Sequence, residues 1–353
     1  MSNQPTRDDA TPVAAETLRT WATHCFAAAG MSDADAALLA DSLVQTSLWG
    51  MDSHGIALLS HYLDRLGNGT VRARPAVHLM RTGPATALLE ADQGHGIVVA
   101  HRAMDEALAI AATQGIGAVG VRNASHCGAI GLYTRRAARA GCVGIAFTHS
   151  NSVAVPHGGR RAFFGTNPIS FAFPRPGGEP VCLDMATTSI PWNRVRNARR
   201  EGHPLPDDVA VDAQGESTTD ANAAAAVTPL GGREYGHKGY ALALVVDLLC
   251  GALLGNLWGP QIPSMYEALD QPRQLGAFFI ALDPARFAGA EAFTAELEAM
   301  AQALAAEPGS PLMPGDPELA VAAQRGRDGI PIEPGLAAQF RAVSQRLGLT
   351  APL

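Results

Sequence analysis

Lysine is almost absent from this sequence of 353 residues. Lys238 is the only lysine among 26 basic residues, and acidic residues outnumber basic ones, which gives a formal net charge of -7. Proteins that bind a nucleic-acid backbone carry clustered lysine and arginine. The composition therefore argues against nucleic acid as a partner. The retention of one lysine suggests a task that arginine cannot perform, such as a compact charge on a ligand, although chance survival of one lysine is an alternative.

Cysteines are few and lack the spacing of a disulfide framework or a zinc ribbon. No two of them form a CxxC pair, which is typical of reduced thiols in a cytosolic protein. No HExxH or equivalent ligand spacing occurs either, so no metal site is predicted. The five cysteines are widely scattered: Cys25, Cys127, Cys142, Cys182 and Cys250.

Targeting and membrane-spanning segments are also lacking. The first residues, MSNQPTRDDATP, contain no apolar core of the kind found in a signal peptide. The most apolar run, residues 240–257, contains Asp247 and is closed by Gly and Pro, which favours a buried core helix over a membrane span. We expect a soluble cytoplasmic protein with no membrane partner.

The pattern of apolar residues predicts an α/β protein with two lobes, because the chain exceeds the usual size of one domain. Apolar residues at helical spacing alternate with short β-rich runs, and a polar excursion or lid is expected at residues 194–226. Helices are predicted at 13–30, 33–48, 61–66, 98–113, 130–139, 239–254, 290–305 and 334–347. Strands are predicted twice within 75–90 and at 118–122, 142–148, 169–174, 181–186 and 276–283.

The segment GIGAVG at residues 115–120 matches the dinucleotide pattern G-x-G-x-x-G. That pattern holds a pyrophosphate only where a strand leads into the N-terminus of a helix. Here the predicted helix comes first and the strand follows. The glycines are therefore expected to end a helix and turn into a sheet, and a Rossmann site is not favoured.

Ser53 and His54, within GMDSHGIALL, are the first candidates for chemistry. A Ser-His-Asp hydrolase is one interpretation. Neighbouring side chains diverge in helices and strands, and no G-x-S-x-G elbow is present, so this interpretation is the weaker one. His54 can instead act as a proton donor near neutral pH, while Ser53 donates a hydrogen bond. A histidine that only caps a helix is the structural alternative.

Three further motifs place polar groups where strands end. His126 in NASHCGAIG lies between a strand and a glycine-opened helix, where it either faces a ligand or caps the helix. The Asn-Pro turn of GTNP presents backbone amides that suit an anion or only reverse the chain. Asp184 lies in an apolar strand, where an unpaired carboxylate is costly, so it needs a partner such as a histidine.

These motifs together resemble the malate/L-lactate dehydrogenase type 2 family. The resemblance covers about residues 13 to 345 and rests on DSHG, S-H-x-G-A-x-G-x-Y, GTNP, DMAT, GHKGY and a late PGD, in this order. It implies an NAD(P)-dependent homodimeric oxidoreductase whose nucleotide-binding sheet is largely antiparallel and is joined to a helical lobe. The corresponding divisions are residues 1–75, a mixed lobe of 76–127 with 280–353, and a cofactor domain of 128–279.

The resemblance also assigns roles by motif. The proton relay falls on Ser53, His54 and Asp184, with His126 as an alternative acid. NAD or NADP would contact Asp184, Met185, Ala186, Lys238, Gly239, Pro314, Gly315 and Asp316. Substrate contacts are expected at Leu58, Thr166, Asn167 and Trp192.

The implied reaction moves a hydride to or from C2 of a small 2-oxo or 2-hydroxy acid, or of a cyclic imino acid. The cofactor supplies the hydride and the protein supplies orientation and a proton. His54, as imidazolium, would protonate the developing oxygen, and Asp184 would raise the pKa of the histidine and orient it. A catalytically silent family member remains an alternative, as does the hydrolase.

The chain departs from the family around the expected substrate. Leu58 stands where many members carry an arginine suited to a substrate carboxylate. Cys127 replaces a usual phenylalanine, and IPWNR follows the DMAT strand. Trp192 could offer an apolar or cation-binding face, and a nearby cation such as Arg194 could replace the missing guanidinium. This predicts poor activity on malate and lactate and better activity on a bulkier or less acidic substrate, unless another arginine holds the carboxylate.

Overall fold

A seven-stranded sheet forms the centre of the computed structural model, which describes residues 10–175 and 177–353. The strand order is β2-β3-β4-β10-β5-β6-β7, and only β3 and β4 pair in parallel. The prediction of a largely antiparallel sheet is confirmed, and a doubly wound Rossmann sheet is excluded. The strands are His78–Gly83, Thr86–Glu90, Ile116–Ala124, Leu275–Leu282, Val143–Thr148, Ile169–Phe173 and Val181–Met185 in that order.

Helices cover both faces of this sheet. Helices α4 (Gly96–Gln114) and α5 (Gly131–Arg139) pack on one face, where Phe279 of β10 is fully buried in the same cluster as residues of α4. Helix α8 (His237–Cys250) lies on the opposite face and packs against Phe278. The alternation of neighbouring side chains along β10 thus divides its phenylalanines between two layers.

The glycines of GIGAVG serve packing between α4 and the sheet. Gly115 ends α4 in the left-handed conformation (φ 82°). A Cβ on Gly117 would lie 2.0 Å from the carbonyl oxygen of Ala107, and one on Gly120 would lie 2.3 Å from a methyl of Leu254. The segment therefore leads from a helix into a strand, as the sequence predicts.

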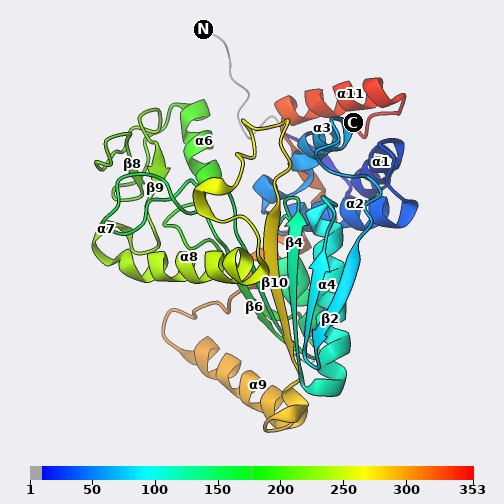
Figure 1. The fold of residues 1–353 in the computed structure, drawn as a ribbon, viewed down its shortest axis with the longest axis vertical. Coiled ribbons are helices and arrows are strands. Elements are labelled where there is room, and N and C mark those ends of the chain that lie inside the picture. Colours follow the sequence, from blue (N-terminus) through cyan, green and yellow to red (C-terminus); the bar gives the residue numbers. More distant parts are fainter. Residues whose placement is uncertain (1–9, 176) are drawn as a thin grey trace.

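A helical lobe adjoins one end of the sheet (Figure 1). Trp21 and Phe340 stack in its core with ring centroids 4.5 Å apart, and the chain ends meet there in the β1–β11 ribbon. The sequence pattern predicts neither this ribbon nor α10. The lobe contains α1 (Ala15–Ala28), α2 (Asp33–Leu48), α3 (Leu59–Gly67), α10 (Asp316–Asp328), α11 (Pro334–Leu347) and the strands Thr11–Val13 and Ile330–Ile332.

A smaller lobe on the other side of the sheet contains the predicted polar excursion. It includes α6 (Trp192–Glu201), which the sequence did not predict, the strands β8 (Ala210–Val211) and β9 (Ala226–Val227), and the short α7 (Gly232–Tyr235) (Figure 1). Val195 and Ala198 of α6 pack into a small core with Val227.

The sheet crosses the predicted divisions of the chain. Its strands come from both sides of the boundary predicted between residues 127 and 128, and β10 crosses the one between 279 and 280. Helix α9 (Ala290–Ala306) extends away from the body of the molecule (Figure 1). The prediction about a signal peptide concerns mostly residues 1–9, which lie outside the described residues.

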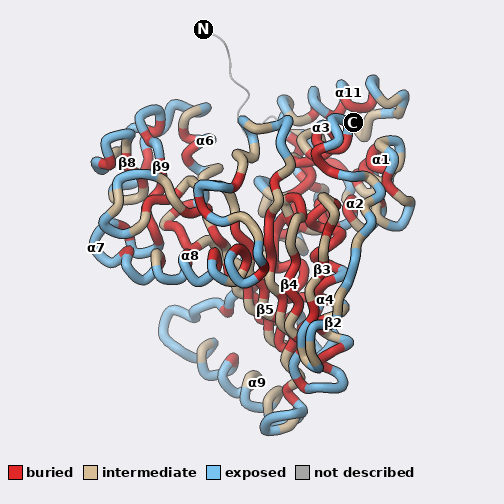
Figure 2. The backbone as a smooth tube through the Cα atoms, in the orientation of Figure 1, coloured by how far each residue is buried: buried red, intermediate tan, exposed pale blue. Residues whose placement is uncertain are grey.

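The apolar run around α8 is only partly buried. Residues His237–Leu254 are long and apolar enough to cross a membrane by length and composition, and 39% of this window is buried. Asp247 lies on the inner side of α8, where its Oδ1 accepts a hydrogen bond from Nδ1 of His149 (3.1 Å). The outer side of the helix is exposed (Figure 2). The predicted core helix therefore has one unpartnered apolar face.

Candidate active site

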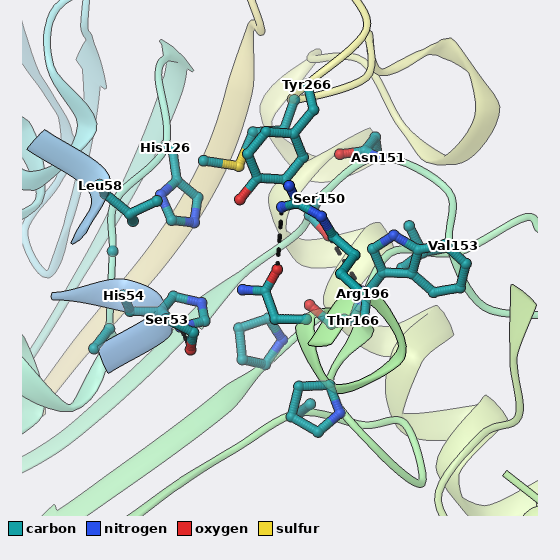
Figure 3. Close-up of a pocket in the computed structure, with 18 of the residues that line it drawn as sticks. Ser53, His54, Leu58, His126, Ser150, Asn151, Val153, Thr166, Arg196 and Tyr266 are labelled. Carbon is teal, nitrogen blue, oxygen red and sulfur yellow. Dashed lines mark hydrogen bonds between the residues drawn. The ribbon is translucent and has the colours of Figure 1, made fainter. Parts of the chain in front are cut away.

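A cavity of about 440 Å³ opens where the helical lobe, the sheet and the α6 lobe meet. His54 and His126 project into it from one side, and Arg196, Asn151 and Tyr266 lie across from them (Figure 3). The cavity brings together most of the predicted catalytic and substrate residues. Those that line it are Ser53, His54, Leu58, His126, Thr166, Asp184, Met185, Ala186 and Trp192.

The DSH motif forms a single turn of 3-10 helix, Asp52–His54, after α2. Arg325 of α10 fastens this turn, because its guanidinium donates to both carboxylate oxygens of Asp52 (2.5 and 3.0 Å) and to the carbonyl of Ser47 (2.6 Å). Gly55 follows, where a Cβ would lie 2.1 Å from Oγ of Ser47. The turn is thus fixed from two sides, and no sequence motif points to Arg325.

Ser53 and His54 are hydrogen-bonded to each other, with 2.8 Å between Ser53 Oγ and His54 Nδ1. The expectation that these neighbouring side chains diverge is wrong, because the tight 3-10 turn differs from the helix and strand on which it was based. Burial lowers the pKa of His54 from its ordinary value of 6.5. The Ser53 contact occupies Nδ1 and leaves Nε2 of His54 for a ligand.

His126 has a different partner, the hydroxyl of Tyr62, which lies 2.7 Å from its Nδ1. Burial raises the pKa of Tyr62 well above its ordinary value and lowers that of His126 well below. Tyr62 is therefore a neutral phenol and His126 a neutral imidazole, and their hydrogen bond occupies Nδ1 and leaves Nε2 of His126 for a ligand. The rings of His54 and His126 lie with centroids 5.7 Å apart. The sequence interpretation did not include Tyr62.

Asp184 at the end of β7 does not orient His54. Its Oδ2 accepts a hydrogen bond from the backbone N–H of Gly131 (2.7 Å) at the start of α5, where a larger residue would collide with the carboxylate. Burial raises the pKa of Asp184 to about 6, although the Gly131 N–H and Arg135 oppose that shift. Among the described residues His54 has no carboxylate partner, so the predicted increase in its pKa is corrected to a decrease.

The GTNP and DMAT motifs form one wall of the cavity. The hydroxyl of Thr187 donates to the carbonyls of Thr166 and Asn167 (both 3.1 Å), which joins the two motifs. Asn167 itself is fully buried, and its amide binds Ala243 of α8 and the backbone of Ser150. Thr166 therefore faces the cavity, whereas Asn167 shapes the wall behind it.

The remaining predicted cofactor residues lie outside this cavity. Lys238 is exposed in the first turn of α8, and Gly239 packs so closely on Leu230 that a Cβ would lie 2.4 Å from its backbone nitrogen. Leu230 in turn donates to the carbonyl of Thr187 (2.9 Å), which places GHKGY beside DMAT. The late PGD turn contacts β7, where the carbonyl of Pro314 accepts from the N–H of Cys182 (2.9 Å).

The cavity contains arginines that the sequence interpretation missed, while Arg194 does not line it. Arg196 lies over the ring of Tyr266 at 3.9 Å, and Nε of Arg199 donates to the carbonyl of Ala221 (2.6 Å). Arg273, in the loop before β10, borders the cavity and is only 4% exposed. No local sequence pattern indicates that an arginine in a loop is buried, so the position of Arg273 becomes evident only from the fold.

Comparison with known proteins identifies the kind of enzyme. The model of the malate/L-lactate dehydrogenase family matches residues 13–341. Ureidoglycolate dehydrogenase (NAD(+)) of Escherichia coli K12 is 38% identical over 285 residues, which is 81% of this chain and 80% of the relative. A sulfolactate dehydrogenase of Chromohalobacter salexigens is named for NADP(+) and is 33% identical, with 88% of this chain and 91% of the relative covered.

Solved structures agree with this assignment. The malate dehydrogenase of Pyrococcus horikoshii superposes with a TM-score of 0.88 at 30% identity, and the match covers 99% of both chains. The fold and the site thus define a dehydrogenase with a non-Rossmann fold. The chain belongs to the malate/L-lactate dehydrogenase family. The predictions of the family, of the fold and of an enzyme that uses NAD or NADP are confirmed.

Proposed function

We propose that this protein reduces a small 2-oxo acid or cyclic imino acid, or oxidises the corresponding 2-hydroxy or amino acid. The observation that carries the proposal is the pair of half-buried histidines, His54 and His126, in one cavity beside the DMAT wall. A nicotinamide supplies the hydride when bound. The protein then has to orient C2 of the substrate and to exchange one proton with the substrate oxygen.

His54 is the proposed proton donor and acceptor. Ser53 holds its Nδ1 at 2.8 Å, so that Nε2 is available to the substrate oxygen. His126 is held by Tyr62 through Nδ1 and has a pKa well below its ordinary value, so it suits a hydrogen bond to the substrate better than transfer of a proton. His126 as the acid is the second candidate, and substitution distinguishes the two.

The residues proposed for the cofactor fit a nicotinamide dinucleotide in their chemistry. Met185, the last residue of β7, and the following Ala186 offer an apolar cavity wall next to Asp184. Lys238 supplies a cation in the first turn of α8, where helix amides also favour an anion such as pyrophosphate. The proposal assigns the remaining cofactor contacts to Gly239, Pro314, Gly315 and Asp316.

A soluble, cytoplasmic homodimer is the proposed assembly, without nucleic acid or membrane as a partner. Its support is the outer side of α8, where several large apolar side chains are exposed: Leu242, Leu244, Val245 and Leu248, with Leu253 in the 3-10 turn that follows. Monomeric proteins rarely expose a continuous apolar surface of this kind, which marks a protein contact. We propose that two copies of this chain cover it.

The experiment that tests the function measures oxidation of NADH and of NADPH with pyruvate, oxaloacetate, bulkier 2-oxo acids and cyclic imino acids. We expect turnover with one nicotinamide and higher kcat/KM on bulkier substrates, because Leu58 and Trp192 line the cavity. Labelling by a serine-directed phosphonate without any NAD(P)H binding would instead support the hydrolase. Cofactor binding without turnover on any substrate would support a catalytically silent protein.

A further inference from the structure

Arg273 has a guanidinium whose hydrogen-bonding capacity is not used within the protein. Its Nη2 donates to Oδ1 of Asn151 (3.0 Å). Its Nε and Nη1 are buried and have no partner among the described residues, where Arg273 also forms no ion pair. A buried cation without a counter-charge is costly and is normally paired. The fold thus retains a charge that the protein itself does not neutralise.

The surroundings of Arg273 increase this excess of positive charge. Arg65, the nearby cation, is bound by backbone carbonyls, among them those of Met265 (2.7 Å) and Gln271 (2.8 Å). Burial, with the repulsion of Arg65, lowers the pKa of Arg273 to about 9. The charge that is missing from this part of the cavity is therefore negative.

The other two arginines of the cavity are already engaged. Arg199 donates to the carbonyls of Ala221 and Ala224, which fixes it as a support of its own lobe. Arg196 is exposed and stacks on Tyr266. Only Arg273 among the described cavity arginines combines burial with unused donors. Leu58, which lines the same cavity, has no charge to offer.

We propose that Arg273 binds the carboxylate of the substrate and so replaces the arginine that is absent at position 58. The inference rests on the proposed function, since it assumes a 2-oxo or imino acid. Nη2 keeps a second hydrogen for a carboxylate oxygen after its bond to Asn151. The ion pair would supply the missing charge, and Leu58 would leave room for a bulkier group on the other side of the substrate.

The test compares two probes that share a skeleton and differ in charge, oxamate and oxamide. Calorimetric titration of the NADH-loaded enzyme should show that oxamate binds more tightly, by about 10- to 100-fold, as a charged hydrogen bond provides. Arg273→Gln should remove this preference. Arg346→Gln, which removes a surface charge paired with Asp64, should retain it.

Two further variants keep the test decisive if Arg273→Gln does not fold. Arg273→Lys retains the charge without the planar fork, so oxamate should bind less tightly than to the wild type but still better than oxamide. The double variant Leu58→Arg/Arg273→Gln should recover oxamate binding. Equal oxamate affinity in the wild type and in a folded Arg273→Gln protein would overturn the proposal, as would a wild type that binds both probes equally.

Turnover separates this inference from the proposed function. If 2-oxo acids are reduced and Arg273→Gln leaves their KM unchanged, the function stands and the role of Arg273 is refuted. If neither a 2-oxo acid nor a cyclic imino acid is reduced while oxamate binding depends on Arg273, the role in carboxylate binding stands and the proposed reaction is refuted. Turnover thus tests the proposed reaction and oxamate binding tests the role of Arg273, so either can be refuted without the other.

Discussion

At the scale of single residues, the partners of the two histidines set their chemical roles. His54 touches a serine hydroxyl and His126 a phenol, and burial lowers the pKa of both. Both hydroxyls remain protonated and can donate or accept, so each histidine keeps its Nδ1 partner while Nε2 stays available to a ligand. The pKa of His126 is lowered further by the nearby His54, so His54 is the one that more readily takes up a proton.

His54→Asn should reduce kcat by about 10²- to 10⁴-fold, the usual contribution of general acid catalysis. Cofactor affinity should change little, because the proposed task of His54 is to exchange a proton with the substrate and not to hold the cofactor. His126→Asn is the matched control and should raise KM more than it lowers kcat. A His54→Asn enzyme that retains most of its kcat would transfer the acid role to His126.

The same histidine predicts the dependence on pH. Reduction needs the imidazolium, and burial lowers the pKa of His54 below 6.5. The rate of reduction should therefore fall as pH rises through that lowered pKa, while oxidation, which needs the neutral ring, should increase. Initial rates in both directions between pH 5 and pH 8 test this, and His54→Asn should lack the transition.

Lys238 carries a second prediction at this scale. Lys238→Met should weaken NAD(P)H binding, and Lys238→Arg should restore the charge but fit less well, because a guanidinium is larger and planar. Fluorescence titration measures the cofactor Kd. Arg233→Gln, an exposed cation in the neighbouring α7, is the control. The same Kd in the wild type and both Lys238 variants would leave the single lysine without a role in the site.

The sequence identified the polar residues of the site but not all of their contacts. Ser53, His54, His126 and Asp184 were found from their neighbours along the chain, and all four line the cavity. Tyr62, which contacts His126, Gly131, which binds Asp184, and Arg325, which binds the neighbouring Asp52, all come from other elements, so the sequence pattern does not reveal them. The Asp184–His54 pair was expected from chemistry alone, and the amide of Gly131 takes the carboxylate instead.

At the scale of elements, α10 acts on the site from a distance. It contains no buried residue, yet Arg325 in its last turn fixes the DSH turn through Asp52. A helix without a buried apolar face has little periodicity to reveal it, which is why α10 was not predicted. The same reason applies to α6, where only Val195 and Ala198 are buried.

Arg325→Gln should lower kcat by up to about 10²-fold while the cofactor Kd stays the same, because a small displacement of His54 disturbs the reacting geometry. Arg325→Lys should recover part of the rate, since it keeps the charge but loses the paired hydrogen bonds. Arg346→Gln in α11 serves as a control for loss of a surface ion pair. Unchanged kcat in a folded Arg325→Gln protein would show that the turn holds its shape without α10.

At the scale of the whole molecule, buried neutral histidines limit stability in acid. Burial lowers the pKa of His95 to about 3 and that of His101 to about 4. The unfolded chain binds these protons near pH 6.5, so the folded state loses stability as pH falls from about 6.5 toward those values. Asp184, whose pKa is raised to about 6, makes the folded state more stable as pH falls. This single carboxyl group offsets only part of the loss that the buried histidines cause.

His95→Asn isolates one such group, because His95 caps α4 through its side chain and asparagine is also a favoured cap. Stability at pH 7 should change little. The loss on moving to pH 5 should be smaller than in the wild type by about 2 kcal/mol, since 1.36 kcal/mol corresponds to each pKa unit. Urea unfolding at both pH values measures it. His203→Asn, at a side chain that is 70% exposed, is the control, and equal losses in all three proteins would contradict the prediction.

Assembly is the remaining property at this scale, and the proposed dimer rests on the exposed apolar face of α8. Val245 and Leu248 are 48% and 51% exposed and lie three residues apart, so they share one face of the helix. Leu248→Asp should convert the dimer to a monomer, because a carboxylate in an apolar contact loses its hydration without gaining a partner. Met300→Asp, at a residue of α9 that is 60% exposed, should leave the dimer intact. Light scattering after gel filtration gives both masses. A wild type that is monomeric at micromolar concentration, or a Leu248→Asp protein that remains dimeric, would assign the apolar face of α8 to another contact.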